Sequence, residues 1–368
     1  MSCAGRRFQI EPATLSNESP KTSGGRLSGN IKIAAGIVIS AVFLYLAARN
    51  VDFRKIPGTI ANVDYTLYGL SILVYLISFY VKALQVKIML GFRSPVGSWS
   101  LAAPIVIGYY CNNIFPLKAG EVVRTSLIAR KKSLPFWSVF SAMLLERSFD
   151  LVFVLLIALA TSFFTAFPPE VNASIRGFVI FLIVAYGAFI ALAALARTKR
   201  RAPAILEKLL PTRVRTWLWT MIERLAEGLW AVKKPLPLAG TFSMGLLFWM
   251  INLLGYWLRL EAFGLPSSFP AVGVFIVVVG LGVSIPSAPS YVGVFHLLVV
   301  FALGVFGVSK DTAFSFALFS HALDFVIVAL LGNAAIVAEG ISMKLLRKSA
   351  SAAPPPPSGG DKPGEGSM

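Results

Sequence analysis

The sequence predicts an all-α polytopic membrane protein, and three observations lead to this fold class. First, 56% of its 368 residues are hydrophobic, whereas a water-soluble domain has about 45–50% apolar residues. Second, the apolar residues gather in stretches of roughly 20, which is the length that a helix needs to cross the hydrocarbon core of a bilayer. Third, Lys and Arg fall in short clusters between these stretches, as in loops that set membrane orientation.

We predict about six full crossings and two re-entrant hairpins broken by proline. The six crossings are Ile31–Ala48, Tyr65–Val81, Trp137–Phe167, Ile175–Ala196, Leu238–Phe263 and Thr312–Glu339. The first hairpin follows Pro104–Phe115, and the second separates Ala271–Ile285 from Tyr291–Val308. Proline stops a helix, so the freed backbone groups must face protein or a wet cavity. The residues expected to form the hinges are Pro116, Gly120, Pro286, Pro289 and Gly293.

Charge asymmetry predicts that both termini lie in the cytoplasm. With the N-terminus inside, three basic segments also fall inside, and two loops without Lys or Arg fall outside. Loop 49–55 and Arg176 depart from the rule. The agreeing segments are 130–132, 197–234 and 344–348 inside, with 168–174 and 264–270 outside.

An inverted repeat follows from this arrangement, because three crossings lie between hairpins that enter from opposite sides. Two short patterns recur at nearly equal offsets, which favours a duplicated unit. Pro116-x-x-x-Gly120 recurs 173 residues later as Pro289-x-x-x-Gly293, and Arg147-x-x-Asp150 recurs 174 residues later as His321-x-x-Asp324.

Three further segments are distinguished by their composition. Residues 1–30 and 346–368 are polar and rich in Ser, Gly and Pro, and we expect both to be disordered, the first on the cytoplasmic side. Segment 203–232 mixes Trp and Leu with Arg and Lys, which is typical of an amphipathic segment lying at the interface near anionic headgroups. The membrane domain between the tails then spans residues 31–345.

Charged residues inside apolar stretches are the candidates for function, because each costs about 2.5–3.5 kcal/mol on insertion scales. The densest group starts at the first break, where three charges spaced by three residues share a broad helix face. A helix start deep in the membrane attracts an anion, since its amides and dipole favour negative charge. We expect a lipid phosphate there, bound by Asn113, Lys118, Glu121 and Arg124.

The next crossing carries Glu146, Arg147 and Asp150. Glu146 and Asp150 lie on one face, and Arg147 can pair with Asp150 one turn away. Two interpretations are open. The three residues form a self-neutralising structural cluster, or they meet the substrate, with the Arg147 guanidinium offering phosphate a bidentate fork.

The second half of the chain is poorer in charge. His296, His321 and Asp324 are its titratable candidates, and the last two would either relay a proton in a driven transporter or form a hydrogen bond between helices. Four other charged residues are expected to snorkel toward the headgroups and to take no part in chemistry. They are Lys82, Lys87, Arg259 and Glu261.

Several classes of function are disfavoured by what the sequence lacks. Its net charge of +17 is spread over loop clusters and forms no nucleic-acid-binding patch. Cys3 and Cys111 provide neither a disulfide framework nor a thiolate metal site. No Walker loop, dinucleotide fingerprint, metal-ligand cluster or nucleophile elbow occurs. We therefore predict a protein without cofactor or metal, and without enzymatic activity of its own.

The breaks and charges together form a recognisable set. Asn113-x-x-Pro116-x-x-x-Gly120-Glu121-x-x-Arg124 is followed by Glu146-Arg147-x-x-Asp150 and later by Pro286-x-x-Pro289-x-x-x-Gly293-x-x-His296. Over roughly residues 30–345 the chain resembles the flippase-like membrane region of lysylphosphatidylglycerol synthases. The resemblance implies a membrane part that moves lipid between leaflets, here without the soluble transferase domain. It also implies functional roles for Glu121, Arg124, Glu146, Arg147 and Asp150.

The resulting hypothesis is a translocator in the bacterial inner membrane that moves an anionic phospholipid or a related lipid by rocking one repeat against the other. Its partners would be lipids with anionic headgroups and a glycosyltransferase or another enzyme of a lipid pathway. The alternative is an accessory subunit or membrane-embedded enzyme acting on a polyprenyl-linked glycolipid or a hopanoid, with Glu121 or Asp150 as acid or base.

Overall fold

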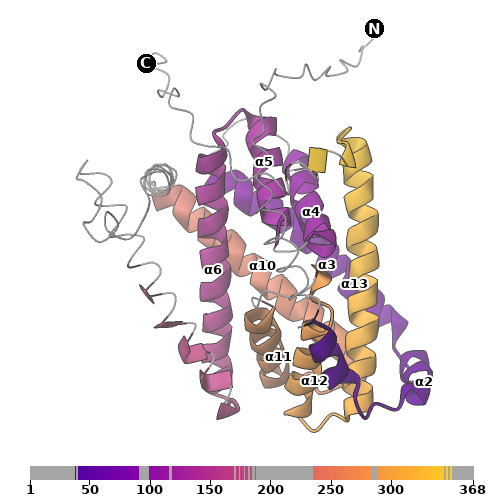
Figure 1. The fold of residues 1–368 in the computed structure, drawn as a ribbon. Coiled ribbons are helices and arrows are strands. Elements are labelled where there is room, and N and C mark those ends of the chain that lie inside the picture. Colours follow the sequence, from indigo (N-terminus) through magenta and orange to yellow (C-terminus); the bar gives the residue numbers. More distant parts are fainter. Residues whose placement is uncertain are drawn as a thin grey trace, which may run out of the picture.

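The computed structural model describes residues 40–90, 99–115, 118–169, 235–283 and 289–343, with scattered positions at 38, 171–187 and 345–349. All regular elements in these ranges are helices, as predicted (Figure 1). They are η1 (Phe53–Lys55), α2 (Ile56–Ala61), α3 (Tyr65–Met89), α4 (Trp99–Ile114), α5 (Gly120–Lys132), α6 (Phe136–Ser162), α10 (Pro235–Ala262), α11 (Phe269–Gly282), η2 (Pro289–Tyr291), α12 (Val294–Gly304) and α13 (Lys310–Ala338).

Three of the described helices are long and apolar enough to cross a membrane, namely α3, residues 238–262 of α10, and α13. Helix α6 is as long, with 27 residues, but it carries the charged triplet of the sequence analysis. Of the predicted crossing Ile31–Ala48, the structure describes residues 38 and 40–48, and these are helical. The predicted crossing Ile175–Ala196 lies largely outside the described residues, and so do the interfacial segment and the two tails. The chain is therefore a multi-pass membrane protein in which part of the crossings is described.

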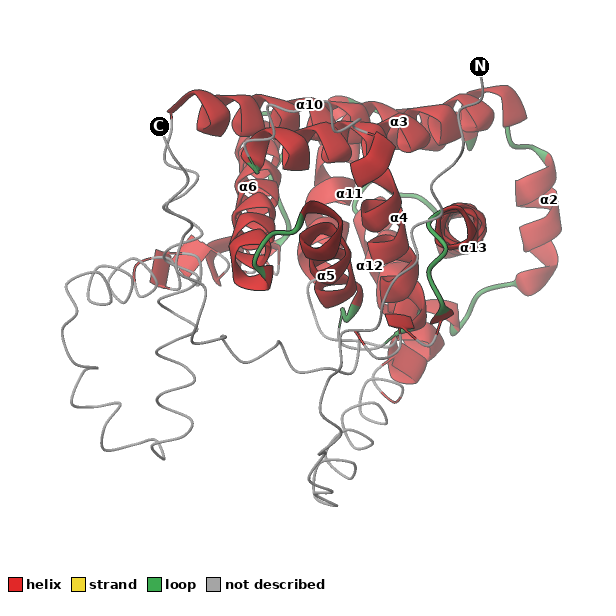
Figure 2. Ribbon diagram, turned by 90° about the horizontal axis from the view of Figure 1, so that it is seen from above, coloured by secondary structure: helices red, strands yellow, loops and turns green. Residues whose placement is uncertain are grey.

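Helices α3 and α10 form an antiparallel pair that runs along one side of the molecule (Figure 2). Helix α3 begins at Tyr65 and is capped by Asp64, whose carboxylate accepts hydrogen bonds from the first free amides of the helix. At one end of the pair Asp64 N donates to Ala262 O at 2.8 Å. Toward the other end Gln85 Nε2 donates to Thr241 O at 3.2 Å. Helix α3 continues to Met89, eight residues beyond the predicted limit.

Each predicted hairpin is a pair of helices separated by a break. Helices α4 and α5 pack together near one end of the molecule, and α11 and α12 near the opposite end (Figure 1). The first helix of each hairpin packs on the long helix that follows the other hairpin, α4 on α13 and α11 on α6. Each hairpin thus packs against a long helix that follows the other hairpin.

Two predicted hinge glycines lie where another backbone comes close. A Cβ on Gly120 would stand 2.0 Å from Gly108 O, so this residue lets α5 start directly against α4. Gly293 has φ of +85°, and its Cβ would stand 2.1 Å from Ser40 O in the N-terminal helix. Pro289 lies in η2, while Pro116 and Pro286 fall outside the described residues.

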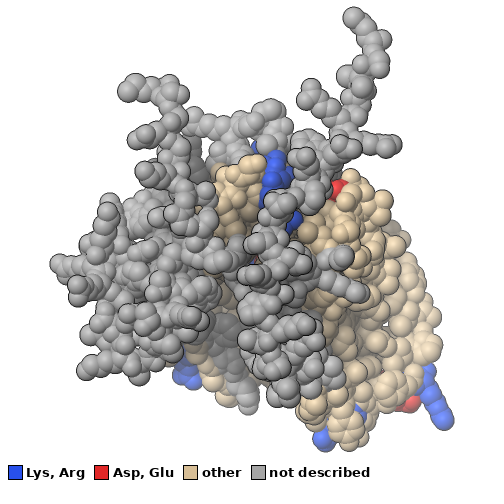
Figure 3. Space-filling model, turned by 45° about the horizontal axis from the view of Figure 1, so that its top comes forward, with Lys and Arg blue, Asp and Glu red and all other residues tan. Residues whose placement is uncertain are grey.

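The described surface carries few charges, and those visible lie mainly toward its upper and lower edges (Figure 3). One such edge group joins the end of the N-terminal helix to α13. Lys310 Nζ donates to Leu46 O at 3.1 Å and to Arg49 O at 2.6 Å. Lys55 Nζ lies 2.7 Å from an Asp311 oxygen, and this hydrogen bond raises the pKa of the exposed Lys55 ammonium.

Candidate functional site

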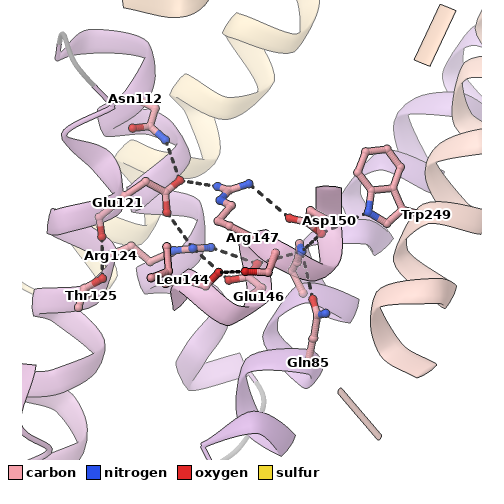
Figure 4. Close-up of polar contacts among 12 residues, drawn as sticks. Gln85, Asn112, Glu121, Arg124, Thr125, Leu144, Glu146, Arg147, Asp150 and Trp249 are labelled. Carbon is pink, nitrogen blue, oxygen red and sulfur yellow. Dashed lines mark hydrogen bonds and ion pairs between the residues drawn. The ribbon is translucent and has the colours of Figure 1, made fainter. Parts of the chain in front are cut away.

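Six charged side chains form one continuous network across three helices (Figure 4). Three are cations and three are carboxylates, so the network as a whole carries no net charge. Its members are Lys82 from α3, Glu121 and Arg124 from α5, and Glu146, Arg147 and Asp150 from α6. The five residues that the sequence selected on α5 and α6 are thus brought together, with one addition.

The addition is Lys82, which the sequence analysis expected to snorkel to the headgroups. That expectation is wrong, because its side chain is fully buried. Lys82 Nζ lies 2.9 Å from Glu146 Oε1 and 2.7 Å from Asp150 Oδ1. Gln85 accepts a third contact at 3.1 Å, and the Phe248 ring centroid lies 4.3 Å away. Because Glu146 and Asp150 are four residues apart, both carboxylates lie on one helix face and contact this ammonium.

Arg124 occupies the middle of the network. Its side chain is 2% exposed, and its Nη2 lies 2.8 Å from Glu121 Oε2 and 3.0 Å from Glu146 Oε2. A Cβ on Gly108 would stand 2.8 Å from Arg124 Cβ, so α4 packs directly on Arg124 at this glycine. Arg124 therefore links α5 to α6 and positions the two carboxylates beside it.

The outer end of the network is formed by Arg147, which is the most exposed member at 39%. Its guanidinium pairs with Glu121 and, at 3.5 Å, with Asp150. Asn112 Nδ2 supports Glu121 from α4 at 3.4 Å. The sequence analysis selected the neighbouring Asn113, which is half-buried on another face of that helix. A guanidinium has five N–H donors, so two ion pairs leave Arg147 with donors for a ligand.

The breaks of the two hairpins meet beside this outer end. Helix α4 packs against η2 of the second break, and Lys118 Nζ of the first break lies 5.7 Å from the Tyr291 ring centroid. Tyr291 also interacts electrostatically with Arg147 and Glu121. Lys118 is exposed and has φ of 53°, since it lies in the turn that leads into α5. It adds one positive charge next to a network that is otherwise neutral.

The second half contains a separate buried ion pair that sequence reasoning missed in part. Arg259 on α10 binds Asp324 on α13 in a bidentate manner, with N–O distances of 2.8 Å and 2.7 Å. The Arg259 side chain is only 5% exposed, so the expectation that it snorkels is wrong. Its guanidinium carbon lies 5.7, 5.4 and 5.7 Å from the rings of Tyr68, Tyr75 and Tyr256.

The predicted histidines lie around the second break. His321 Nε2 lies 2.8 Å from Ser290 O, a hydrogen bond between α13 and η2. Asp324 forms its ion pair with Arg259. The proton relay through His321 and Asp324 stays a prediction. His296 is 3% exposed, with its Nδ1 unpartnered among the described residues, and its ring centroid lies 5.1 Å from that of His321.

A sequence signal for the two missed cations does exist. Each belongs to a polar stripe at i, i+4, i+7 on a helix that is otherwise apolar, and such a stripe faces the protein interior rather than lipid. The stripes are Ser78, Lys82 and Gln85 on α3, and Asn252, Tyr256 and Arg259 on α10.

Comparison with known proteins adds two findings. A family model described as the lysylphosphatidylglycerol synthase transmembrane region matches residues 33–332. The glycosyltransferase AglD of Haloferax volcanii is 25% identical over 130 residues, which are 34% of this chain and 20% of that protein. This chain thus matches about a fifth of the length of that relative. No solved structure matches.

Proposed function

This chain belongs to the lysylphosphatidylglycerol synthase transmembrane family, and on that premise we propose that it moves an anionic lipid between the leaflets of a membrane. The observation that carries the proposal is the meeting of two helix breaks at an exposed, positively charged end of a buried ionic network. Lys118 and Arg147 supply the positive charge there. A phosphate group entering between the breaks is the ligand that this chemistry fits best.

The network divides into an inner part that holds helices together and an outer part that binds. Lys82 and Glu146 have no exposed side-chain surface, and Arg124 has almost none, so these residues neutralise one another. Arg147 is held in place by Glu121 and Asp150 while keeping donors free. The expected roles of Arg124 and Arg147 thereby separate, with Arg124 as a positioning residue and Arg147 as the phosphate ligand.

An inverted repeat supports alternating access for this site. In the first half, Lys82 of α3 pairs with Asp150 of α6 across the hairpin between those helices. In the second half, Arg259 of α10 pairs with Asp324 of α13 across the other hairpin. Helices α3 and α10 run antiparallel, as repeats of opposite orientation require. We infer re-entrant hairpins that meet within the bilayer, and rocking of one repeat against the other.

The proposal is tested by leaflet exchange in phosphatidylcholine liposomes that contain the purified chain and a trace of fluorescent phosphatidylglycerol. Bleaching of the outer leaflet removes more than half of the signal only if lipid exchanges. The double variant Lys118→Gln with Arg147→Lys should exchange about tenfold more slowly, equivalent to ~1.4 kcal/mol. Lys131→Gln is the matched control, since it removes a charge that pairs with Glu339 at the far end of α5.

Two results would count against the proposal. Absence of exchange by the intact chain, with several labelled anionic lipids, rules out the translocator. Full exchange by the double variant removes Lys118 and Arg147 from the site.

We propose that the protein lies in the bacterial inner membrane with both termini cytoplasmic. Lipids with anionic headgroups would be its partners.

A second candidate function is favoured by the match to a glycosyltransferase. In it, the chain is an accessory subunit or membrane-embedded enzyme for a polyprenyl-linked glycolipid or a hopanoid. Glu121 and Asp150 would be its acid or base, and a glycosyltransferase would be its partner. Chromatography of the lipids after incubation separates the two functions, because a new covalent product appears only if the chain or its partner is catalytic.

A further inference from the structure

A polar cleft lies between α3 and α10, apart from the six-residue network. It is a half-open depression and not an enclosed cavity. Its polar lining comes from α3, α10 and α13, and includes Ser71, Tyr75, Asn252, Tyr256, Arg259 and Asp324. A hydroxyl-lined and amide-lined cleft between two apolar spans is costly, which makes it a candidate binding site.

The charge in this cleft is balanced, which distinguishes it from the phosphate site proposed above. Arg259 is neutralised by its bidentate bond to Asp324. The exposed fraction of the Asp324 side chain is 25%, against 5% for Arg259, so the carboxylate is the more accessible partner. An accessible carboxylate accepts hydrogen bonds from hydroxyl groups and repels phosphate. The cleft therefore selects for a neutral donor-rich group.

The remaining polar groups fit the same ligand chemistry. Asn252 Nδ2 donates to Phe248 O at 2.7 Å, so the amide oxygen is the atom that can accept from a ligand. Tyr75 and Tyr256 each combine a flat apolar ring with a hydroxyl that both donates and accepts. A sugar or polyol presents the matching combination of alternating hydroxyls and apolar C–H faces.

We propose that this cleft binds a neutral, hydroxyl-rich headgroup of the sugar or polyol class, carried by a lipid. The headgroup is assigned to a lipid because, on both helices, apolar residues next in sequence to cleft residues are exposed. Leu73 is 53% exposed, Leu254 is 47% and Trp257 is 41%. The proposal does not depend on leaflet exchange of anionic lipid, and it stands or falls separately.

The test measures lipid binding to the full chain in phosphatidylcholine nanodiscs by native mass spectrometry. The probes are glucosyl diacylglycerol, plain diacylglycerol and phosphatidylglycerol, with free glucose as a soluble competitor. We expect the glucosyl lipid to bind roughly tenfold more tightly than plain diacylglycerol, since each hydrogen bond contributes about 2- to 10-fold. The double variant Tyr75→Phe with Asn252→Leu should lose that preference.

Tyr68→Phe is the matched control. Tyr68 also faces the Arg259 guanidinium, but its hydroxyl donates to Ser320 at 3.0 Å and it does not line the cleft. This variant should keep the preference for the glucosyl lipid. If the double variant fails to fold, Tyr256→Phe removes one cleft hydroxyl while keeping the ring, and it should weaken the preference severalfold.

Each remaining outcome decides the proposal. If millimolar free glucose competes with the glucosyl lipid, and the same variants abolish this competition, the cleft binds a sugar. The ligand is then a soluble sugar and not a lipid headgroup. Equal binding of the glucosyl lipid and plain diacylglycerol overturns the proposal. It is overturned as well if the double variant keeps the preference, or if phosphatidylglycerol binds best and depends on Tyr75 and Asn252.

Discussion

Lys82 on α3 lies 2.7 Å from the Asp150 carboxylate on α6, and the lysine side chain is completely buried. An ammonium this deep in an apolar helix costs several kcal/mol to desolvate, so it persists because carboxylates surround it. Glu146 supplies the second carboxylate at 2.9 Å. The pair joins the helix before the first hairpin to the helix after it, as Arg259 and Asp324 do for the second hairpin.

Replacing Lys82 by Met should destabilise the protein strongly, because Glu146 and Asp150 lose their compensating charge. Breaking a buried ion pair on one side typically costs about 3–5 kcal/mol. Unfolding in a detergent titration, together with abundance in membranes, measures the effect. Lys87→Met serves as the control, since Lys87 is half-buried near the end of the same helix. Equal stability of the two variants would contradict a structural role for Lys82.

The Arg259 and Asp324 pair should respond differently to single and double replacement. Arg259→Met alone leaves a carboxylate without its bidentate partner, and we expect a loss of about 3–5 kcal/mol. Arg259→Met with Asp324→Leu removes both charges and should recover most of that loss. A thermodynamic cycle of detergent unfolding quantifies the coupling. Additive losses in the double variant would show that the two residues do not stabilise each other.

Gly120→Ala should disrupt the first hairpin, since the added methyl group would stand 2.0 Å from Gly108 O and 2.5 Å from Asn112 Oδ1. Backbone atoms on the other side cannot give way, so α5 must shift and the ionic network with it. Gly69→Ala on α3 has nothing within 4 Å and should be neutral or slightly stabilising. Similar melting temperatures for both variants would argue against the close helix approach.

Arg147→Lys alone should lower leaflet exchange of an anionic lipid about threefold, less than the double variant with Lys118→Gln, while leaving membrane abundance unchanged. Lysine keeps the charge but lacks the planar fork that contacts two oxygens. Arg124→Lys should reduce abundance more than Arg147→Lys does, because Arg124 is 2% exposed against 39% for Arg147. The two readouts together separate a ligand from a positioning residue. If Arg147→Lys lowers abundance and exchange in equal proportion, Arg147 is structural.

Membrane orientation is tested at Asn172, which is exposed in the loop predicted to face the periplasm. With Cys3 replaced by Ser, a cysteine at Asn172 should react with an impermeant maleimide in spheroplasts. The remaining Cys111 is 1% exposed and gives a low background. Labelling that requires disruption of the inner membrane would reverse the assigned topology.

The fold class and the crowded charges of the first half could be read from the sequence alone. Apolar stretches of membrane-spanning length between basic clusters have no other favourable environment than lipid. Local spacing was also sufficient to predict the ion pair of Arg147 with Asp150, because residues three apart share a helix face in every tertiary arrangement. The predicted breaks likewise coincide with helix starts, since α5 begins at Gly120 and Gly293 precedes the first residue of α12.

Partners of buried charges were decided by tertiary structure. Lys82 and Arg259 resemble snorkelling residues in sequence, because both lie within two turns of a helix end. Instead, Lys82 contacts two carboxylates of α6 and Arg259 contacts one carboxylate of α13, and these carboxylates lie 64 to 68 residues away in the sequence. The polar stripe on each helix indicates which face meets protein, but the counter-ion on that face comes from a neighbouring helix. That contact determines whether a charge reaches water or a buried partner.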